Sequence, residues 1–263
     1  MAHGNAALQY FDLAPDPVKL SQLAAGALMF ERGDVQPAQR TLNRSYSREQ
    51  VIESLRPGKM EAPYFTPGFP LALPLVHGVR INSFAGPPTG PFDSMTTNPI
   101  ISDTGEMVWR TGEKGSGVVS VDTARSQALV GHLARQPVAT KNLRAEIQTR
   151  FCALTLGALD GRPIADAGRL LLTATARSAN TGMVWNEQRT SLEKWGDAPV
   201  RIEPVTGRII LTSLAPARDV VAQPMDGAGQ PLGRPLPLKR TGNDWSLDLG
   251  QPATVWFVIS VSR

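Results

Sequence analysis

Apolar residues recur along most of this chain in short runs bounded by glycine, proline and asparagine, a pattern typical of strands joined by turns. The clearest example is a set of three runs separated by Asp160-Gly161 and Thr206-Gly207, both of which favour turns. The central run, 169–185, ends in a polar segment, 178–182, that predicts another turn. We therefore predict that these runs form the spine of an antiparallel β-sandwich in a mainly β fold.

The β pattern extends upstream of this spine. Residues 105–112 and 115–123 predict a hairpin, and residues 126–134 predict a further strand. The run 144–159 is long enough to continue as a helix, but its threonines, phenylalanine and cysteine favour a strand.

The pattern also extends downstream. Residues 218–262 alternate apolar runs with Asp226-Gly227 and Gly242-Asn243, which are typical of hairpin turns. These runs predict a small C-terminal antiparallel sheet that closes the domain.

The N-terminal region follows a helical period instead. Residues 5–12 predict a short strand, Asp16 and Pro17 supply a helix cap and first turn, and Gly33 ends the helix. The apolar positions at helical spacing are Leu20, Leu23, Ala24, Ala27 and Leu28. A single strand-helix unit cannot bury both faces of a parallel sheet. It therefore either packs on the β domain or is the remnant of a larger α/β domain.

A second short helix is predicted after an extended piece, with Ser47 and Gln50 at capping-box spacing and Pro57-Gly58 at its end. The segment 61–99 is dense in proline and glycine and predicts an irregular surface stretch, with a strand at 75–84.

Four regions follow from these patterns. They are an N-terminal strand-helix remnant at 1–60, the irregular segment at 61–99, the β-sandwich at 100–215 and the small C-terminal sheet at 216–263.

The composition is that of a folded protein. Hydrophobic residues make up 41% of the 263 and charged residues 19%, which is ordinary for a globular chain. The net charge of +4 comes from scattered Lys and Arg, with no basic run among aromatic residues, so we expect no nucleic-acid partner. No apolar run approaches the roughly 20 residues that span a membrane, and no signal peptide is evident, so we expect no membrane partner and leave the localisation open.

No single motif in the sequence is strong evidence for catalysis. No nucleophile-elbow motif occurs, and His77 and His132 are more typical of surface or core histidines than of general bases. Ser116, His132 and Asp122 would make a serine triad only if the fold brought them together. His132 and Glu187, near predicted turns, are the candidates for a hydrolase.

Cofactor and metal signals are absent from the sequence pattern. The one cysteine, Cys152, excludes an intrachain disulfide, and its apolar run favours a packed thiol over a nucleophile. No paired cysteines, His-x-His or EF-hand spacing occur, and Asp160 and Asp166 flank a predicted turn, where they serve the backbone. We expect neither a metal nor a cofactor.

One polar-aromatic stretch is a candidate for binding carbohydrate, because sugar C–H faces stack on indole rings while polar side chains bond the hydroxyls. Its residues are Asn180, Trp185, Glu187, Arg189 and Trp195. The alternative is that both tryptophans plug the core of the sandwich.

Several strings are distinctive as sequences. They are SDTGEMVW, VVSVDTARSQALVG and LLLTATARSANTGMVWNEQRTSLEKWGDAPVRIEPVTG, then MDGAGQPLG and TVWFVIS near the end, and ALQYFD with PVKLSQLAAGALMFERGDVQPA at the start. The first three resemble the β-sandwich downstream of the catalytic TIM barrel in a group of large bacterial glycoside hydrolases. The C-terminal strings resemble the small immunoglobulin-like sheet of those enzymes, and the N-terminal ones resemble the last barrel strand and helix.

This resemblance implies a carbohydrate-associated β-sandwich without the barrel's catalytic carboxylates, which lie on earlier barrel strands. Two alternatives stay open. One is a self-standing hydrolase acting on an ester, a lactone or a glycoside, and the other is a structural or interaction module. The expected partner is a carbohydrate or a small-molecule substrate.

The apolar stripe of the predicted N-terminal helix must be covered, because exposing it to water is costly. Either the stripe packs on the β domain of its own chain, or chains associate through it. We expect a homodimer or larger assembly.

Overall fold

The computed structural model describes residues 7–8, 13–54, 69–94, 97–113, 116–135 and 137–263. Over these residues the chain is mainly β, with several antiparallel sheets and few helices, as the sequence predicts. It forms two compact units, one made of residues Met1–Val35 and Ser116–Arg263 and one of residues Gln36–Gly115. Within the described ranges, no helix is long and apolar enough to cross a membrane.

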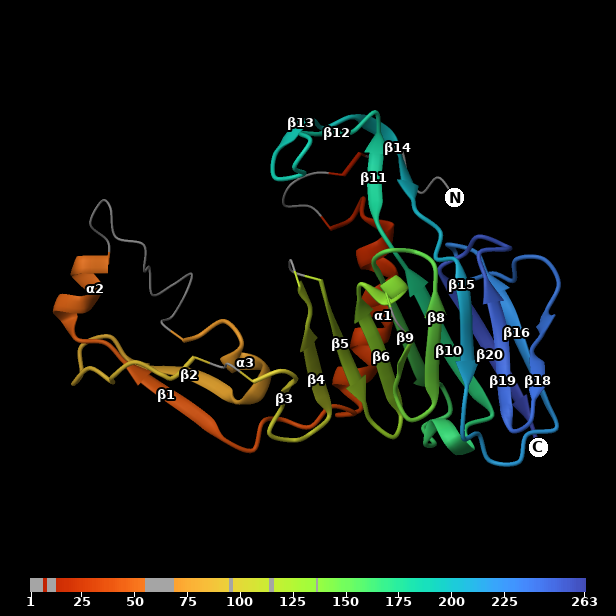
Figure 1. Cartoon of the computed structure of the whole chain (residues 1–263), viewed down its shortest axis with the longest axis horizontal. Helices are drawn as coiled ribbons and strands as arrows, with labels where there is room; N and C mark the ends of the chain where they lie inside the picture. Colours follow the sequence, from red (N-terminus) through yellow and green to blue (C-terminus); the bar gives the residue numbers. More distant parts are fainter. Residues whose placement is uncertain (1–6, 9–12, 55–68, 95–96, 114–115, 136) are drawn as a thin grey trace. The chain divides into compact units, whose positions relative to one another are not determined.

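The first unit contains a large and a small antiparallel sheet (Figure 1), besides two separate two-stranded pairs. Within this unit the large sheet follows the order β17-β16-β20-β10-β9-β6-β5, and the small sheet follows the order β18-β19-β15-β8-β7. The strands of the large sheet are β5 (Gly117–Asp122), β6 (Ser126–Gly131), β9 (Cys152–Ala158), β10 (Arg169–Thr175), β16 (Asp219–Met225), β17 (Leu236–Pro237) and β20 (Trp256–Ser262). Those of the small sheet are β7 (Val138–Ala139), β8 (Leu143–Ile147), β15 (Gly207–Leu211), β18 (Lys239–Thr241) and β19 (Asp244–Leu249). Two short 3-10 turns, η2 (Leu133–Arg135) and η3 (Ile164–Asp166), lie in the connections.

One hydrophobic core joins the two sheets. Leu154 of β9 and Leu172 of β10 are fully buried in the same cluster as Ile209 and Leu211 of β15. Successive strand residues point to opposite faces, so alternate residues of each strand supply this core. Burial of these side chains is the main favourable contribution to the sandwich.

The predicted glycine turns lie between strands. Gly161, between β9 and β10, and Gly242, between β18 and β19, have φ of 75° and 61°, a region that favours glycine. Gly207 begins β15 with φ 127°, and a Cβ there would lie 2.5 Å from the carbonyl oxygen of Glu146. A side chain at residue 207 would therefore displace β8.

Three segments differ from, or sharpen, the sequence prediction. Residues 178–181, predicted as a turn, form strand β11 (Ser178–Thr181), and the turn comes at Gly182 with φ 74°. The ambiguous run 144–159 is β8 and β9, not a helix. Residues 216–263 do not form a sheet of their own, because their strands are divided between the large and small sheets. Local patterns indicate strands but not their partners far away in sequence.

Helix α1 (Pro17–Glu31) begins and ends where the sequence predicts. Asp16 caps it, with its Oδ1 accepting from the backbone N–H groups of Val18 and Lys19, and Gly33 follows the helix with φ 57°. The strand predicted at 5–12 falls mostly outside the described residues.

Of the two alternatives for the apolar stripe of α1, packing on the β domain of its own chain is wrong for all of its residues except the half-buried Leu28; association through a second chain stays a prediction. Leu20 and Leu23 are 44% and 54% exposed, and Ala24 and Ala27 are exposed too. Helix α1 packs on β9 and β10 with its opposite face, where Ser21 and Ala25 are buried. On this side of the large sheet, Thr173 and Thr175 bond Gln22 of α1, and Leu28 and Met29 of α1 lie against Leu171.

The second unit contains β1 (Thr41–Ser45), α2 (Arg48–Ser54), α3 (Leu73–Val76), β2 (Gly78–Ser83), β3 (Ile100–Ile101) and β4 (Met107–Thr111). Strands β1 and β2 pair in parallel, and β3 and β4 pair antiparallel. The predicted capping box is present at α2. The backbone N–H of Ser47 donates to Gln50 Oε1, and that of Gln50 donates to Ser47 Oγ. Its predicted end, Pro57-Gly58, lies outside the described residues.

Candidate functional site

A ribbon of four short strands, residues 178–202, continues from the end of β10 and lies outside the two sheets (Figure 1). Strand β11 pairs with β14 (Asp197–Ile202), and β12 (Val184–Trp185) pairs with β13 (Leu192–Lys194). Gly196 has φ 69°, and a Cβ there would lie 2.4 Å from the carbonyl oxygen of Thr181. Only glycine lets the two strand pairs approach this closely.

Both tryptophans of the candidate carbohydrate stretch lie on this ribbon and are half-exposed. Trp185 is 47% and Trp195 is 46% exposed, so neither tryptophan is buried in the core. Trp185 pairs with Leu192, while Val184 pairs with Lys194, the residue before Trp195. The two indoles therefore emerge from neighbouring positions of one ribbon.

The tip of the ribbon is organised by Asn186. Its Oδ1 accepts from the backbone N–H groups of Thr190 and Ser191 at 2.8 and 3.2 Å, and its Nδ2 donates to Thr190 Oγ1 at 3.0 Å. Arg189 within this tip has φ 56°, an uncommon conformation for a residue with a side chain. These bonds hold the loop next to Trp185 in one shape.

Glu187 and Arg189 are exposed at this tip. Among the described residues, neither side chain has a hydrogen-bond or ion-pair partner. Both are therefore open to a ligand.

Asn180 has a different role from the one that the sequence suggests. It is 3% exposed, and its Oδ1 accepts from the backbone N–H of Leu8 at 2.6 Å. Its Nδ2 donates to the carbonyl oxygens of Leu8 and Trp195, at 3.2 and 3.0 Å. The amide is occupied by protein partners, so Asn180 positions Trp195 and the N-terminal segment instead of facing a ligand.

The serine triad considered from the sequence is not assembled. The backbone N–H of His132 donates to the carbonyl oxygen of Gly117, at the end of the β5–β6 hairpin where Ser116 lies. Asp122 pairs with Gln127 at the other end of that hairpin, and its carboxylate accepts from the backbone N–H of Lys141. Four residue pairs separate the two ends, which keeps the carboxylate out of reach of the imidazole.

The two hydrolase candidates also stay apart. His132 follows β6, packs edge-on against Phe151 with ring centroids 5.4 Å apart, and has a buried Nδ1 with no partner among the described residues. Glu187 lies at the tip of the ribbon, and no hydrogen bond or ion pair joins the two. The described residues thus show no assembled acid–base pair at these positions.

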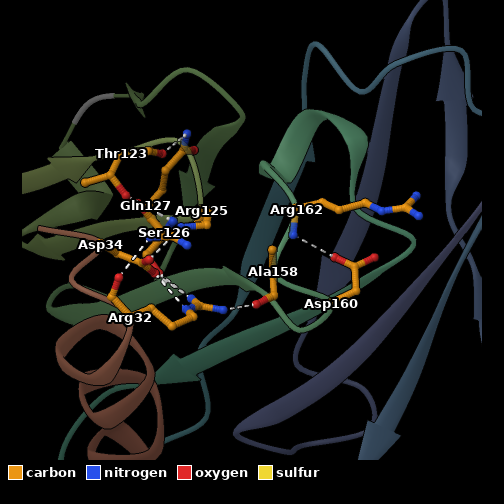
Figure 2. Close-up of polar contacts among 9 residues, drawn as sticks. All are labelled: Arg32, Asp34, Thr123, Arg125, Ser126, Gln127, Ala158, Asp160 and Arg162. Carbon is orange, nitrogen blue, oxygen red and sulfur yellow. Dashed lines mark hydrogen bonds and ion pairs between the residues drawn. The ribbon is translucent and has the colours of Figure 1, made fainter.

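A buried polar network, absent from the sequence prediction, ties the end of α1 to the large sheet (Figure 2). The carboxylate of Asp34 is fully buried. Its Oδ2 lies 2.5 Å from Arg32 Nη2 and accepts from Ser126 Oγ at 2.7 Å. Its Oδ1 lies 2.9 Å from Arg125 Nε, at an angle outside the range of a hydrogen bond.

Arg32 extends the network to β9 by donating to the carbonyl oxygen of Ala158, and Arg125 Nη2 donates to the carbonyl oxygen of Arg32 at 2.9 Å. The one carboxylate, Asp34, is paired with two arginines of its own chain, so we assign the network a structural role. The sequence held no signal for it, because its two halves, Arg32 with Asp34 and Arg125 with Ser126, lie more than 90 residues apart.

A shallow groove of about 600 Å³ lies on the small sheet and was also missed. Glu146, Arg208 and Asp248 line it from β8, β15 and β19. Asp248 accepts from Lys239 Nζ and Arg208 Nε, each at 2.8 Å, and these bonds lower the pKa of its carboxyl below the ordinary value. A carboxylate held ionised by two cations cannot donate a proton near neutral pH, which disfavours acid catalysis here.

The remaining ionisable candidates have structural partners. Burial, and to a lesser degree the nearby charge of Glu203, raises the pKa of the Cys152 thiol to about 12, so Cys152 is a packed thiol. Burial would raise the pKa of Asp160, but the backbone N–H groups of Gly168 and Arg162 outweigh it and lower that pKa. Figure 2 shows the bond from Arg162 within this turn.

In the second unit, His77 Nδ1 lies 2.9 Å from Asp103 Oδ2, so His77 is a partnered histidine. Within the part of the chain that the structure describes, no three His, Cys, Asp or Glu side chains are grouped as a metal ion would require.

Comparisons with protein-family models, with curated proteins and with solved structures found no match to this chain. The fold and the site together define a mainly β, antiparallel protein with an exposed, tryptophan-bearing ribbon.

Proposed function

We propose that this chain is a carbohydrate-associated β-sandwich protein that binds a glycan through Trp185 and Trp195 on the ribbon, without catalysing hydrolysis. The observation that carries the proposal is the half-exposure of both indoles on one ribbon. Exposed aromatic faces are costly in water and are a usual feature of binding sites.

The polar surroundings suit the same ligand. Indole faces stack on the C–H faces of sugar rings, and the unpartnered side chains of Glu187 and Arg189 are available to bond hydroxyl groups. The bonds from Asn186 fix the loop before any ligand arrives, which reduces the entropy lost on binding.

The resemblance of the sequence to the β-sandwich of bacterial glycoside hydrolases is a second support, and it motivates the choice of ligand. Glycoside hydrolysis needs two carboxyl groups across the scissile bond. Beside the tryptophans the ribbon carries three exposed acidic residues, Glu187, Glu193 and Asp197. No described contact holds two of these carboxyl groups facing each other. We therefore favour binding over turnover.

Affinity electrophoresis against a panel of polysaccharides tests the proposal. We expect the wild-type chain to be retarded by at least one glycan, and Trp185→Ala and Trp195→Ala each to weaken the interaction by about fivefold, since a stacked ring contributes on the order of 1 kcal/mol.

Val184→Ala is the matched control, because it trims another exposed apolar residue of the same ribbon, 44% exposed, without removing an aromatic face. Retardation unchanged in both tryptophan variants, or absent with every glycan, would refute the proposal.

A further inference from the structure

Helix α1 carries large apolar side chains on its solvent side, in addition to the half-buried Leu28 and Met29 that lie against the large sheet. On its inner side, Gln22 Nε2 donates to Thr175 Oγ1 at 2.7 Å, and Gln22 Oε1 accepts from Thr173 Oγ1 at 3.1 Å. The outer side consists of Leu20, Leu23, Ala24, Ala27 and Phe30, with Phe30 87% exposed. The solvent side of a surface helix normally carries polar residues.

The two charges of α1 are also reversed. Lys19 and Glu31 are its only charged residues, with Lys19 in the first turn and Glu31 at the last position. A helix favours acidic side chains at its N-terminus and basic ones at its C-terminus, so both charges oppose the helix dipole. Both are exposed, at the two ends of the apolar side. Lys19 contacts Asp16 of its own chain at 3.4 Å, whereas Glu31 has no partner among the described residues.

We propose that the outer side of α1 is a homodimer interface in which two copies of the helix pack antiparallel about a two-fold axis level with Ala25. This arrangement places Lys19 of one copy opposite Glu31 of the other, and Leu20 opposite Phe30. Lys19 then lies near Glu31 and the C-terminal end of the second helix, whose dipole favours a positive charge. Glu31 lies near Lys19 and the N-terminal end, whose dipole favours a negative charge.

The sizes of the residues fit this register. Leu23 faces Ala27 of the second copy, so a large side chain meets a small one. A parallel pair would instead place Lys19 against Lys19, which is unfavourable. The charges and the size pattern thus favour a second copy in the antiparallel orientation as the occupant.

Sedimentation equilibrium of the intact chain over a wide concentration range tests the interface. We expect a reversible monomer–dimer equilibrium, weakened more than about tenfold by Leu23→Glu, because a buried charge would have no partner. Leu71→Glu, at another residue that is 87% exposed but lies in the second unit, is the matched control and should leave the equilibrium unchanged. Circular dichroism verifies that each variant is folded.

A charge exchange tests the antiparallel register. Lys19→Glu and Glu31→Lys should each weaken self-association, since each puts like charges together twice in a symmetric dimer. An equal mixture of the two variants should associate again, because every opposed pair then has opposite signs.

Ala24→Cys provides a separate test near the two-fold axis. Because Cys152 is buried with a raised thiol pKa, the new thiol is the reactive one, and it should form disulfide-linked dimers on mild oxidation, whereas Leu71→Cys should not. A monodisperse monomer at the highest concentration, a dimer indifferent to Leu23→Glu, or a mixture that stays monomeric would each overturn the proposal.

Discussion

The two faces of the large sheet, formed by the same strands, are held by different interactions. On the inner face, Leu154 and Leu172 are fully buried against the small sheet. On the outer face, Thr155 and Thr173 bond each other at 2.5 Å, and Thr173 also donates to Gln22 of α1. The inner face depends on apolar burial, while the outer face adds matched donors and acceptors to the half-buried Leu171, Leu28 and Met29 under the helix. The outer face therefore determines which side of α1 turns inward.

The largest effect should come from the buried charge network that ends this outer interface. Asp34→Ala leaves Arg32 and Arg125 without their shared carboxylate, and removing one partner of a buried ion group costs about 3 to 5 kcal/mol of unfolding free energy. Urea denaturation measures the loss. Asp160→Ala, which removes an exposed carboxylate from a turn, is the control and should cost much less. A loss below about 1 kcal/mol for Asp34→Ala would mean that the network contributes little.

The inner face should respond almost as strongly through packing. Leu172→Ala leaves a cavity between the two sheets and should lower the unfolding free energy by about 2 to 5 kcal/mol. Leu171→Ala trims the next residue of β10, which is half-buried on the opposite face, and should cost less. Equal losses for the two variants would contradict the contrast between the faces.

The smallest of the three effects should come from the bonds under α1. Gln22→Ala leaves the hydroxyls of Thr173 and Thr175 without their helix partner and should cost about 1 to 3 kcal/mol, as measured by thermal and urea unfolding. Leu23→Ala changes the next residue, on the exposed side. At concentrations too low for association it should cost less than about 0.5 kcal/mol. The reverse ranking would mean that α1 is held by its apolar side.

The sequence was sufficient for the fold class and for local chain features. Apolar runs between glycine turns predicted strands, and Asp16 and Gly33 marked the ends of α1, because caps and turns depend on neighbouring residues. The face that α1 buries was not predictable in this way. The sequence left two alternatives for the apolar stripe, and the threonines that bond Gln22 on the opposite face lie more than 150 residues away.

The candidate site was predictable in its residues but not in its exposure. Trp185 and Trp195 were identified from composition, but the sequence could not decide between a core and a surface position. Asn180 looked like a ligand contact because its type suits one, whereas its amide bonds the backbone of Leu8, 172 residues away. The type of a residue suggests which ligand its side chain can bind, but contacts with residues far away in sequence decide whether its polar atoms are already occupied.

The docking of α1 has a consequence for folding during synthesis. The helix leaves the ribosome early, yet Trp256, which donates to the carbonyl oxygen of Ser21, follows 235 residues later. At typical elongation rates this gap lasts on the order of ten seconds or more. Contacts of such high sequence separation also close slowly. The contact between α1 and β20 therefore cannot form until the last strand is made, and until then the nascent chain leaves that part of the inner side of the helix open to chaperones or to neighbouring chains.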